Sequence, residues 1–260
     1  MRLVIFLKKK LLLYVLMFIF ACGAVYSGFY IITYKIDEFN TQKQIEVIEN
    51  NTELVEIPSN NDNTLNKENN LNLLNADFSE LKKINSDVRG WIKVNGTNIN
   101  YPFVQSSNNS YYLNHSFDKS NNIAGWVFLD YRNNLFTDKN TIIYAHNTRN
   151  KNMFGSLKNI LTNSWLNNSN NFIIKLSTEH ENTLWQVFSL YHIPTTSDYI
   201  KVSFKNNEEF EEFANMLTNR SLHNFNNNVS KNDRILTLST CYSKTERLVL
   251  HAKLIKREAK

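Results

Sequence analysis

The 260-residue chain contains only two cysteines, Cys22 and Cys241. Cys22 lies in a long apolar stretch, where a thiol behaves as a small hydrophobic side chain. A bridge between the two would have to join that stretch to the rest of the protein, so a disulfide framework is excluded. No two histidines have metal-ligand spacing, and no second cysteine follows the apolar stretch. We therefore expect no zinc site, no other metal and no cofactor.

Charge is missing from residues 11–34, and no acidic residue precedes Asp37. About 20 apolar residues span a bilayer as a helix. The lysines at positions 8–10 favour an N-terminus kept inside the cell. A cleaved signal peptide is the alternative, but this stretch is too long and its small residues lie in its middle. We expect a basic cytoplasmic tail at 1–10, an uncleaved membrane anchor after it, and an extracellular remainder.

A basic excess is likewise missing from the rest of the chain. Five cations lie in the first 35 residues, and the remainder has 24 basic and 24 acidic residues. The folded domain therefore has no predicted basic face, and we expect no nucleic-acid partner. Cys241 would be a free thiol in an exported domain, which requires an explanation.

Residues 35–75 are rich in Asn, Glu, Thr and Lys and predict a polar, partly helical stalk. Within it, 42–57 has the pattern of an amphipathic helix, and the stretch around 58–70 indicates a linker. The globular domain is expected at 76–260.

That domain is expected to begin with a short helix, since Asp77 followed by Glu80 is a capping-box pattern. Beyond it, Asn95-Gly96 lies between two strand-like runs and is a strong hairpin signal. Eight strand-like runs with few helices indicate a mainly β domain with peripheral helices, closed or nearly closed into a barrel, rather than a βαβ sheet. The strand runs are 91–94, 99–104, 125–129, 141–145, 172–176, 184–191, 234–240 and 247–256, and the later helical patterns are 153–166 and 208–217.

Cys241 follows an alternating strand pattern, and a strand end can aim a side chain that the next loop leaves accessible. A cysteine nucleophile needs a base or cation to supply the thiolate, and a donor to stabilise the oxyanion. His146 ends another apolar strand and mirrors the placement of Cys241. Arg247 opens the next strand and would lie close to the thiol if the two strands form a hairpin. From these residues alone, a structural cysteine and an arginine paired with Glu246 or solvent remain open alternatives.

The segment Thr-Leu-Ser-Thr-Cys at 237–241 resembles the Thr-Leu-x-Thr-Cys signature of sortases, enzymes that attach proteins to the Gram-positive cell wall. The run 247–254 is similar to the strand that bears the family's catalytic arginine. Tyr-Ala-His-Asn at 144–147, with Met-Phe-Gly at 153–155, resembles the class B branch, as does 122–133. The helical pattern at 208–217 falls where class B members have an extra helix, and the resemblance covers 76–258 in order.

The resemblance implies an eight-stranded sortase barrel with an N-terminal helix and an extra helix between late strands. It implies that Cys241 attacks the Thr of a C-terminal sorting signal similar to Asn-Pro-x-Thr-x and forms a thioacyl intermediate. An amine of peptidoglycan, or of its lipid-linked precursor, then takes the protein. His146 would act as acid and base, and Arg247 would hold the substrate backbone and stabilise the oxyanion.

Three further positions, Tyr144, Asn114 and Ser239, match substrate contacts in class B members. The alternatives are an exported cysteine peptidase that mainly hydrolyses, a pilus-polymerising sortase, and a binding module that merely retains the barrel. One departure stands out, because Arg247 lies only six positions after Cys241, a shorter spacing than is typical of class B. The residues that follow the cysteine, Tyr-Ser at 242–243, also replace acidic residues sometimes found there.

Overall fold

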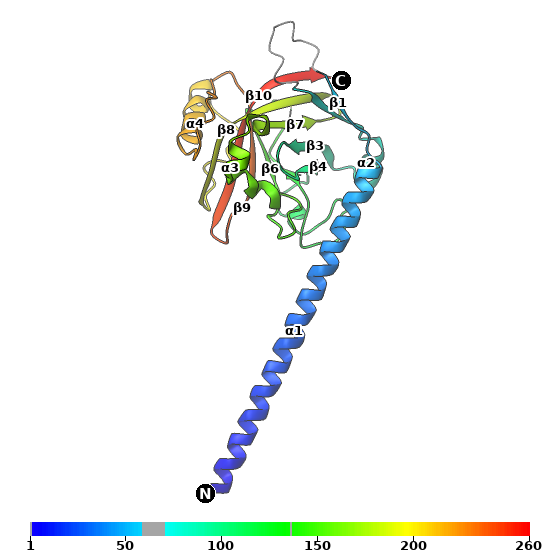
Figure 1. Cartoon of the computed structure of the whole chain (residues 1–260), viewed down its shortest axis with the longest axis vertical. Coiled ribbons are helices and arrows are strands. Elements are labelled where there is room, and N and C mark those ends of the chain that lie inside the picture. Colours follow the sequence, from blue (N-terminus) through cyan, green and yellow to red (C-terminus); the bar gives the residue numbers. More distant parts are fainter. Residues whose placement is uncertain (1, 59–70, 136) are drawn as a thin grey trace. The chain divides into compact units, whose positions relative to one another are not determined.

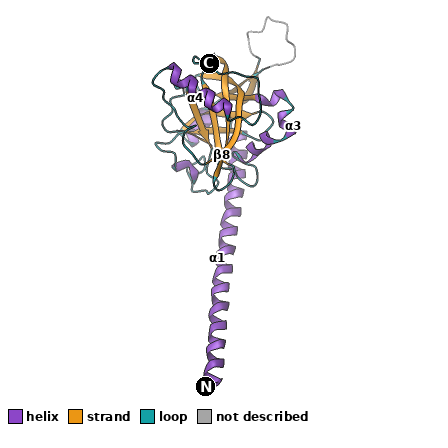
Figure 2. Ribbon diagram, turned by 90° about the vertical axis from the view of Figure 1, so that its left-hand side faces the viewer, coloured by secondary structure: helices purple, strands orange, loops and turns teal. Residues whose placement is uncertain are grey.

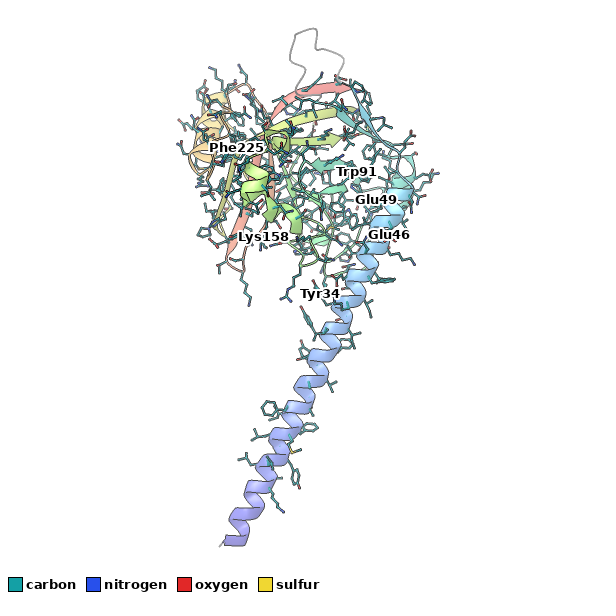
Figure 3. All side chains as sticks on the ribbon, viewed as in Figure 1. Tyr34, Glu46, Glu49, Trp91, Lys158 and Phe225 are labelled. Carbon is teal, nitrogen blue, oxygen red and sulfur yellow. The ribbon has the colours of Figure 1, made fainter. Side chains whose placement is uncertain are left out.

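The computed structural model describes residues 2–58, 71–135 and 137–260. The chain divides into two units, Met1–Lys43 and Gln44–Lys260. The first unit consists of most of helix α1, Arg2–Asn50. The large apolar side chains of residues 11–32 are exposed and point outward around the helix (Figure 3). By length and composition this helix could cross a membrane, in agreement with the predicted anchor.

The second unit is a closed β-barrel, as the strand pattern predicted (Figure 2). In the described residues its order is β10-β8-β7-β3-β4-β5-β6-β9. Most neighbours are antiparallel, but β4–β5 and β6–β9 are parallel. The strands are β3 Val88–Val94, β4 Asn100–Val104, β5 Phe128–Leu129, β6 Asn140–Tyr144, β7 Ile173–Ser177, β8 Glu181–Pro194, β9 Ile235–Cys241 and β10 Glu246–Ala259.

The two larger of three apolar clusters in the described residues hold most of this unit together. The larger includes Trp91, which is wholly buried. The smaller joins side chains of the late strands to helix α4, Asn207–Asn219, which lies beside β8 (Figure 1). Asn206 caps α4 by accepting a hydrogen bond from the Glu209 backbone N–H at 2.9 Å. Burial of these side chains is the main stabilising contribution.

The amphipathic helix expected at 42–57 is only partly present. Helix α1 ends at Asn50, and Leu54–Ile57 forms strand β1, which pairs antiparallel with β2, Leu73–Ala76. A strand partner about 20 residues away overrides the local helical pattern, because the ladder satisfies the backbone groups of both segments. Most of the expected linker, at 59–70, lies outside the described residues.

The capping box predicted at Asp77 is wrong in detail. Helix α2 spans Ser79–Ile84 and has Phe78 at its N-cap without a side-chain cap. The Asp77 carboxylate instead accepts from the Ser79 N–H at 2.9 Å, and Glu80 pairs with Lys83. The helix is therefore offset by one residue from the pattern.

Two other expectations differ from the structure. Only Phe128–Leu129 of the run 125–129 is strand, because Gly125 has φ of +59° and ends a turn. Met153 has φ of +51°, so the helix expected from it begins later and is broken. The short helices of the described loops are η1 Tyr111–Leu113, η2 Gly155–Leu161, α3 Asn163–Leu166 and η3 Ser169–Phe172.

Candidate active site

Three strand ends bring the predicted catalytic side chains together. Cys241 is the last residue of β9, and Arg247 lies directly opposite it in β10. In the parallel pair of β6 and β9, Tyr144 is level with Ser239. Since both strands run the same way, two further residues bring His146 level with Cys241. The hairpin of β9 and β10 that the sequence predicted is confirmed.

Two side-chain hydrogen bonds join the ends of β6 and β9. The Thr240 hydroxyl donates to the Ala145 carbonyl at 2.7 Å, and Asn147 Nδ2 donates to the Cys241 carbonyl at 2.7 Å. Ala145 and Asn147 flank His146 on either side. The bonds therefore hold the histidine and cysteine backbones in register beyond the end of the ladder. Sequence reasoning assigned no role to Asn147, although it directly follows the histidine.

The His146 ring is oriented by a backbone carbonyl. Its Nε2 lies 2.7 Å from the Leu113 oxygen, at the end of η1. A carbonyl oxygen only accepts hydrogen bonds, so Nε2 carries the proton in this contact. In the neutral ring, Nδ1 is then the nitrogen free to take a proton. Leu113 was not predicted, and its backbone role leaves no sequence signal.

The loop after His146 folds back against it. The Phe154 N–H donates to the His146 carbonyl at 3.0 Å, and Asn147 forms an isolated antiparallel β-bridge with Met153. Gly155 permits this turn, because a Cβ there would lie 2.4 Å from the Thr148 carbonyl oxygen. This close approach explains the glycine of the Met-Phe-Gly segment.

Arg247 is half-buried, and no ion pair to it is present among the described side chains. Its guanidinium lies 3.4 Å from the Glu246 carbonyl oxygen, a long contact. The Glu246 carboxylate instead lies 3.2 Å from His192 Nδ1. Arg247 therefore contacts Glu246 only through the backbone, without a carboxylate ion pair, and the alternative of an arginine paired with Glu246 or solvent stays a hypothesis. Five donors on a guanidinium without a carboxylate partner suit an anionic or carbonyl ligand.

The three predicted substrate contacts have different surroundings. Tyr144 is half-buried and donates its hydroxyl to Asp130 at 2.9 Å. Ser239 is buried, and its hydroxyl lies 2.9 Å from the Tyr199 hydroxyl. Asn114 is exposed and follows the residue that contacts His146. All three adjoin the strand ends of the site, but Ser239 reaches it through Tyr199.

Tyr199 is a site residue that sequence reasoning missed. Burial raises the pKa of its hydroxyl, while the positive charge of Arg247 acts in the opposite direction and Cys241 adds to the rise. Its phenol therefore lies within electrostatic reach of both residues. It comes from the long connection between β8 and α4, where no pattern in the sequence marks it.

The short β9–β10 turn carries an aromatic side chain at its start. The Tyr242 ring stacks on His192 with centroids 4.6 Å apart, and Lys158 Nζ lies 5.3 Å from its centroid. Glu246 pairs with the same histidine. The turn therefore has its acidic residue at its far side, where it contacts His192.

His251 is packed rather than catalytic. It is wholly buried in β10, with Nε2 2.9 Å from the Tyr191 hydroxyl and Nδ1 2.9 Å from the Thr237 hydroxyl. Burial lowers the pKa of His251 to about 3, so the ring is neutral at ordinary pH.

Among the described residues no cluster of three His, Cys, Asp or Glu side chains could hold a metal ion.

A thiol, an imidazole and a guanidinium at one end of three adjacent strands form the set that cysteine-dependent acyl transfer requires. Comparison with known proteins agrees. Residues 92–255 match the family model of the sortase domain. The chain is 39% identical to sortase B of Staphylococcus aureus over 184 residues, 69% of this chain and 75% of that protein.

Solved structures show the same fold. Clostridium perfringens sortase B is 36% identical, with a TM-score of 0.66 over 69% of this chain and all of that one. A Staphylococcus aureus sortase B–substrate complex is 38% identical, with a TM-score of 0.64 over 69% of this chain and 84% of that one. The chain belongs to the sortase family, in class B, and is a cysteine transpeptidase. The family acts on substrates that carry a sorting signal.

Proposed function

We propose that Cys241 is the nucleophile of this transpeptidase, with His146 as its acid and base and Arg247 as its electrophilic partner. The Cys241 sulfur attacks the carbonyl carbon of the sorting signal's Thr, and the peptide C–N bond breaks. The protonated His146 gives its proton to the leaving amine. The product is a thioacyl enzyme, and Arg247 donates hydrogen bonds to the oxyanion formed on the way.

In the second half of the reaction an amine attacks the thioester carbon. His146 takes a proton from the incoming nitrogen, and the Cys241 thiolate leaves. We assign this proton transfer to Nδ1, since Nε2 donates to the Leu113 carbonyl. The covalent intermediate divides one difficult exchange into two easier steps, which lets an amine compete with water.

For the substrates, we propose a sorting signal similar to Asn-Pro-x-Thr-x and an amine of peptidoglycan or its lipid-linked precursor. Tyr144 would contact the signal directly, Ser239 would act on it through Tyr199, and Asn114 would contact it from the loop beside His146. The N-terminal helix would be a single-pass anchor with its N-terminus in the cytoplasm and the catalytic domain outside. Anchoring would raise the effective concentration of membrane-bound substrates.

The observation that carries the assignment is the register of β6, β9 and β10, which sets Arg247 opposite Cys241 and His146 level with it. The test incubates the full-length chain in mild detergent with a fluorescent Asn-Pro-x-Thr-x peptide, with and without an amine acceptor. We expect a thioacyl adduct on Cys241 by mass spectrometry and a ligated product with the amine. Undiminished cleavage by Cys241→Ala would overturn the assignment, and hydrolysis without any ligation would favour the peptidase alternative.

A further inference from the structure

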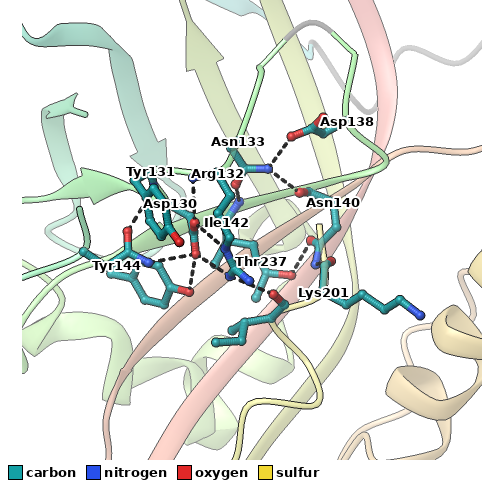
Figure 4. Close-up of polar contacts among 12 residues, drawn as sticks. Asp130, Tyr131, Arg132, Asn133, Asp138, Asn140, Ile142, Tyr144, Lys201 and Thr237 are labelled. Atoms are coloured by element: carbon teal, nitrogen blue, oxygen red, sulfur yellow. Dashed lines mark hydrogen bonds and ion pairs between the residues drawn. The ribbon is translucent and has the colours of Figure 1, made fainter. Parts of the chain in front are cut away.

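Asp130 is a carboxylate without any exposed side-chain surface, in the loop after β5. It accepts five hydrogen bonds. Oδ1 accepts from the Arg132 N–H at 3.0 Å and from Arg132 Nε at 2.9 Å. Oδ2 accepts from Arg132 Nη2 at 2.7 Å, Asn109 Nδ2 at 3.0 Å and the Tyr144 hydroxyl at 2.9 Å. Figure 4 shows the guanidinium and the phenol converging on this carboxylate.

This carboxylate is charged in the folded protein. Its burial alone would raise the pKa of Asp130, but the hydrogen bonds from Arg132, Tyr144 and Asn109 outweigh that effect and lower the pKa. A buried ion pair is often no more stabilising than apolar side chains of the same volume. In some proteins such a pair instead fixes one geometry, so the question is which elements this pair joins.

The pair holds two elements of the proposed active site. Tyr144 is level with Ser239 in the β6–β9 ladder, two residues before His146 and Cys241. Arg132 Nη2 also donates to the Ile200 carbonyl at 3.0 Å, in the connection between β8 and α4. The neighbouring Tyr199 hydroxyl contacts Ser239. The carboxylate therefore links both tyrosines whose phenols lie at the site.

A second polar network in Figure 4 serves as a comparison. Asn133 Nδ2 donates to Asp138 at 2.8 Å and to the Asn140 carbonyl at 2.8 Å, and Thr237 donates to Asn140 Oδ1 at 2.7 Å. These bonds lie at the start of β6 and contact none of the proposed site residues. Asn140 Nδ2 also donates to the Lys201 carbonyl at 2.9 Å, so this network reaches the connection between β8 and α4 as well. The Asp130 pair differs because it alone of the two binds Tyr144 directly.

We propose that Asp130 and Arg132 are positioning residues, which hold the Tyr144 phenol and the Tyr199–Ile200 segment in the geometry that binds the sorting signal. The inference rests on the proposed function of the Cys241 site. Loss of the pair would leave the thiol chemically intact, because β9 and β10 keep their own ladder. It would loosen the walls of the peptide groove, and misplacement by about 1 Å costs up to roughly 100-fold in rate.

The test compares Asp130→Asn, Arg132→Gln and the double variant, each as the full-length chain in mild detergent. The first measurement is kcat and KM for the sorting peptide, and the second is the rate of Cys241 alkylation by iodoacetamide, which needs no peptide groove. We expect kcat/KM to fall roughly 10- to 100-fold, mainly through KM, with alkylation within about twofold of the wild type. The double variant should lose no more than the worse single one, because the two residues act as a unit.

Glu181→Gln is the matched control. Glu181 is buried and pairs with Arg257, and the two lie at the ends of β8 and β10 that are far from His192 and Arg247. It should lower the melting temperature but leave KM unchanged. The proposal is overturned if Asp130→Asn keeps a wild-type kcat/KM, or if Glu181→Gln raises KM as much.

Arg132→Lys covers the case in which Asp130→Asn does not fold. Lysine keeps the charge but cannot bridge the carboxylate and the Ile200 carbonyl with a planar fork. We expect a raised KM with unchanged alkylation, and a wild-type KM would reject the inference. Failure of the proposed function itself would be visible separately, as cleavage that survives Cys241→Ala.

Discussion

Arg247 lies directly across the β9–β10 ladder from Cys241, and a four-residue turn joins the two strands. Opposite residues of an antiparallel pair lie about 4.5 to 5.5 Å apart at Cα. The short turn therefore places the two side chains on the same face of the ladder. This relationship makes Arg247 the easiest of the proposed catalytic groups to test.

Arg247→Lys should lower kcat/KM by about 100- to 1000-fold, as loss of an oxyanion donor does. Lysine keeps the charge but presents no fork that could hold a carbonyl and an oxyanion together. Steady-state kinetics with the sorting peptide measure the loss. Lys253→Gln, on the same strand but toward its far end, should have wild-type kinetics. Equal activity of Arg247→Lys and the wild type would contradict the assigned role.

Asn147→Ala should lower kcat/KM roughly tenfold and destabilise the fold by about 1 kcal/mol. It removes the bond that ties the residue after His146 to the Cys241 carbonyl. The loss should be in kcat, because the base and the nucleophile become misaligned. Asn150→Ala, in the same loop but exposed, is the control. An unchanged kcat would show that the ladder alone sets the alignment.

Gly155→Ala should be inactive or nearly so while the barrel stays folded. The new Cβ would lie 2.4 Å from the Thr148 carbonyl oxygen, so the loop after His146 has to move. Circular dichroism should show the wild-type β-sheet content, while the cleavage rate falls. Ser156→Ala, the next residue, adds no atoms and provides the comparison. A fully active Gly155→Ala would mean that the loop does not orient His146.

His251 should make the fold less stable in acid. Its pKa is near 3 in the folded protein against about 6.5 in the unfolded chain. Because the folded pKa is lowered, the contribution of His251 is complete above pH 6.5 and falls as the pH drops toward 3. The free energy of unfolding falls by up to about 1.4 kcal/mol for each pH unit in this range.

Denaturant unfolding at pH 7 and pH 5 measures this effect. The glutamine of His251→Gln cannot titrate. Between pH 7 and pH 5 the free energy of unfolding of this variant should therefore fall by about 2 kcal/mol less than that of the wild type. His180→Gln changes an exposed histidine and should keep the wild-type difference. The assignment is wrong if the two variants respond to pH alike.

The sequence predicted the structural features that depend on residues close together in the chain. Alternating apolar residues indicated the strands, Asn95-Gly96 indicated the β3–β4 hairpin, and the strand ends indicated Cys241 and His146. The Cys241–Arg247 pairing could be predicted because a tight turn leaves the chain little choice of partner. Local signals failed where a distant partner competed, as at Leu54–Ile57, which pairs with β2.

What the sequence by itself determined is the set of chemical groups, the eight strands, the membrane-compatible helix and the class B pattern. Only the tertiary structure decided that β6 and β9, which begin 95 residues apart in their ladder, run parallel and bring His146 level with Cys241. It alone set the Leu113 carbonyl against the imidazole, and Asp130 between Tyr144 and Arg132. Such contacts depend on how the barrel closes, and that is set by the packing of the whole core rather than by any local pattern.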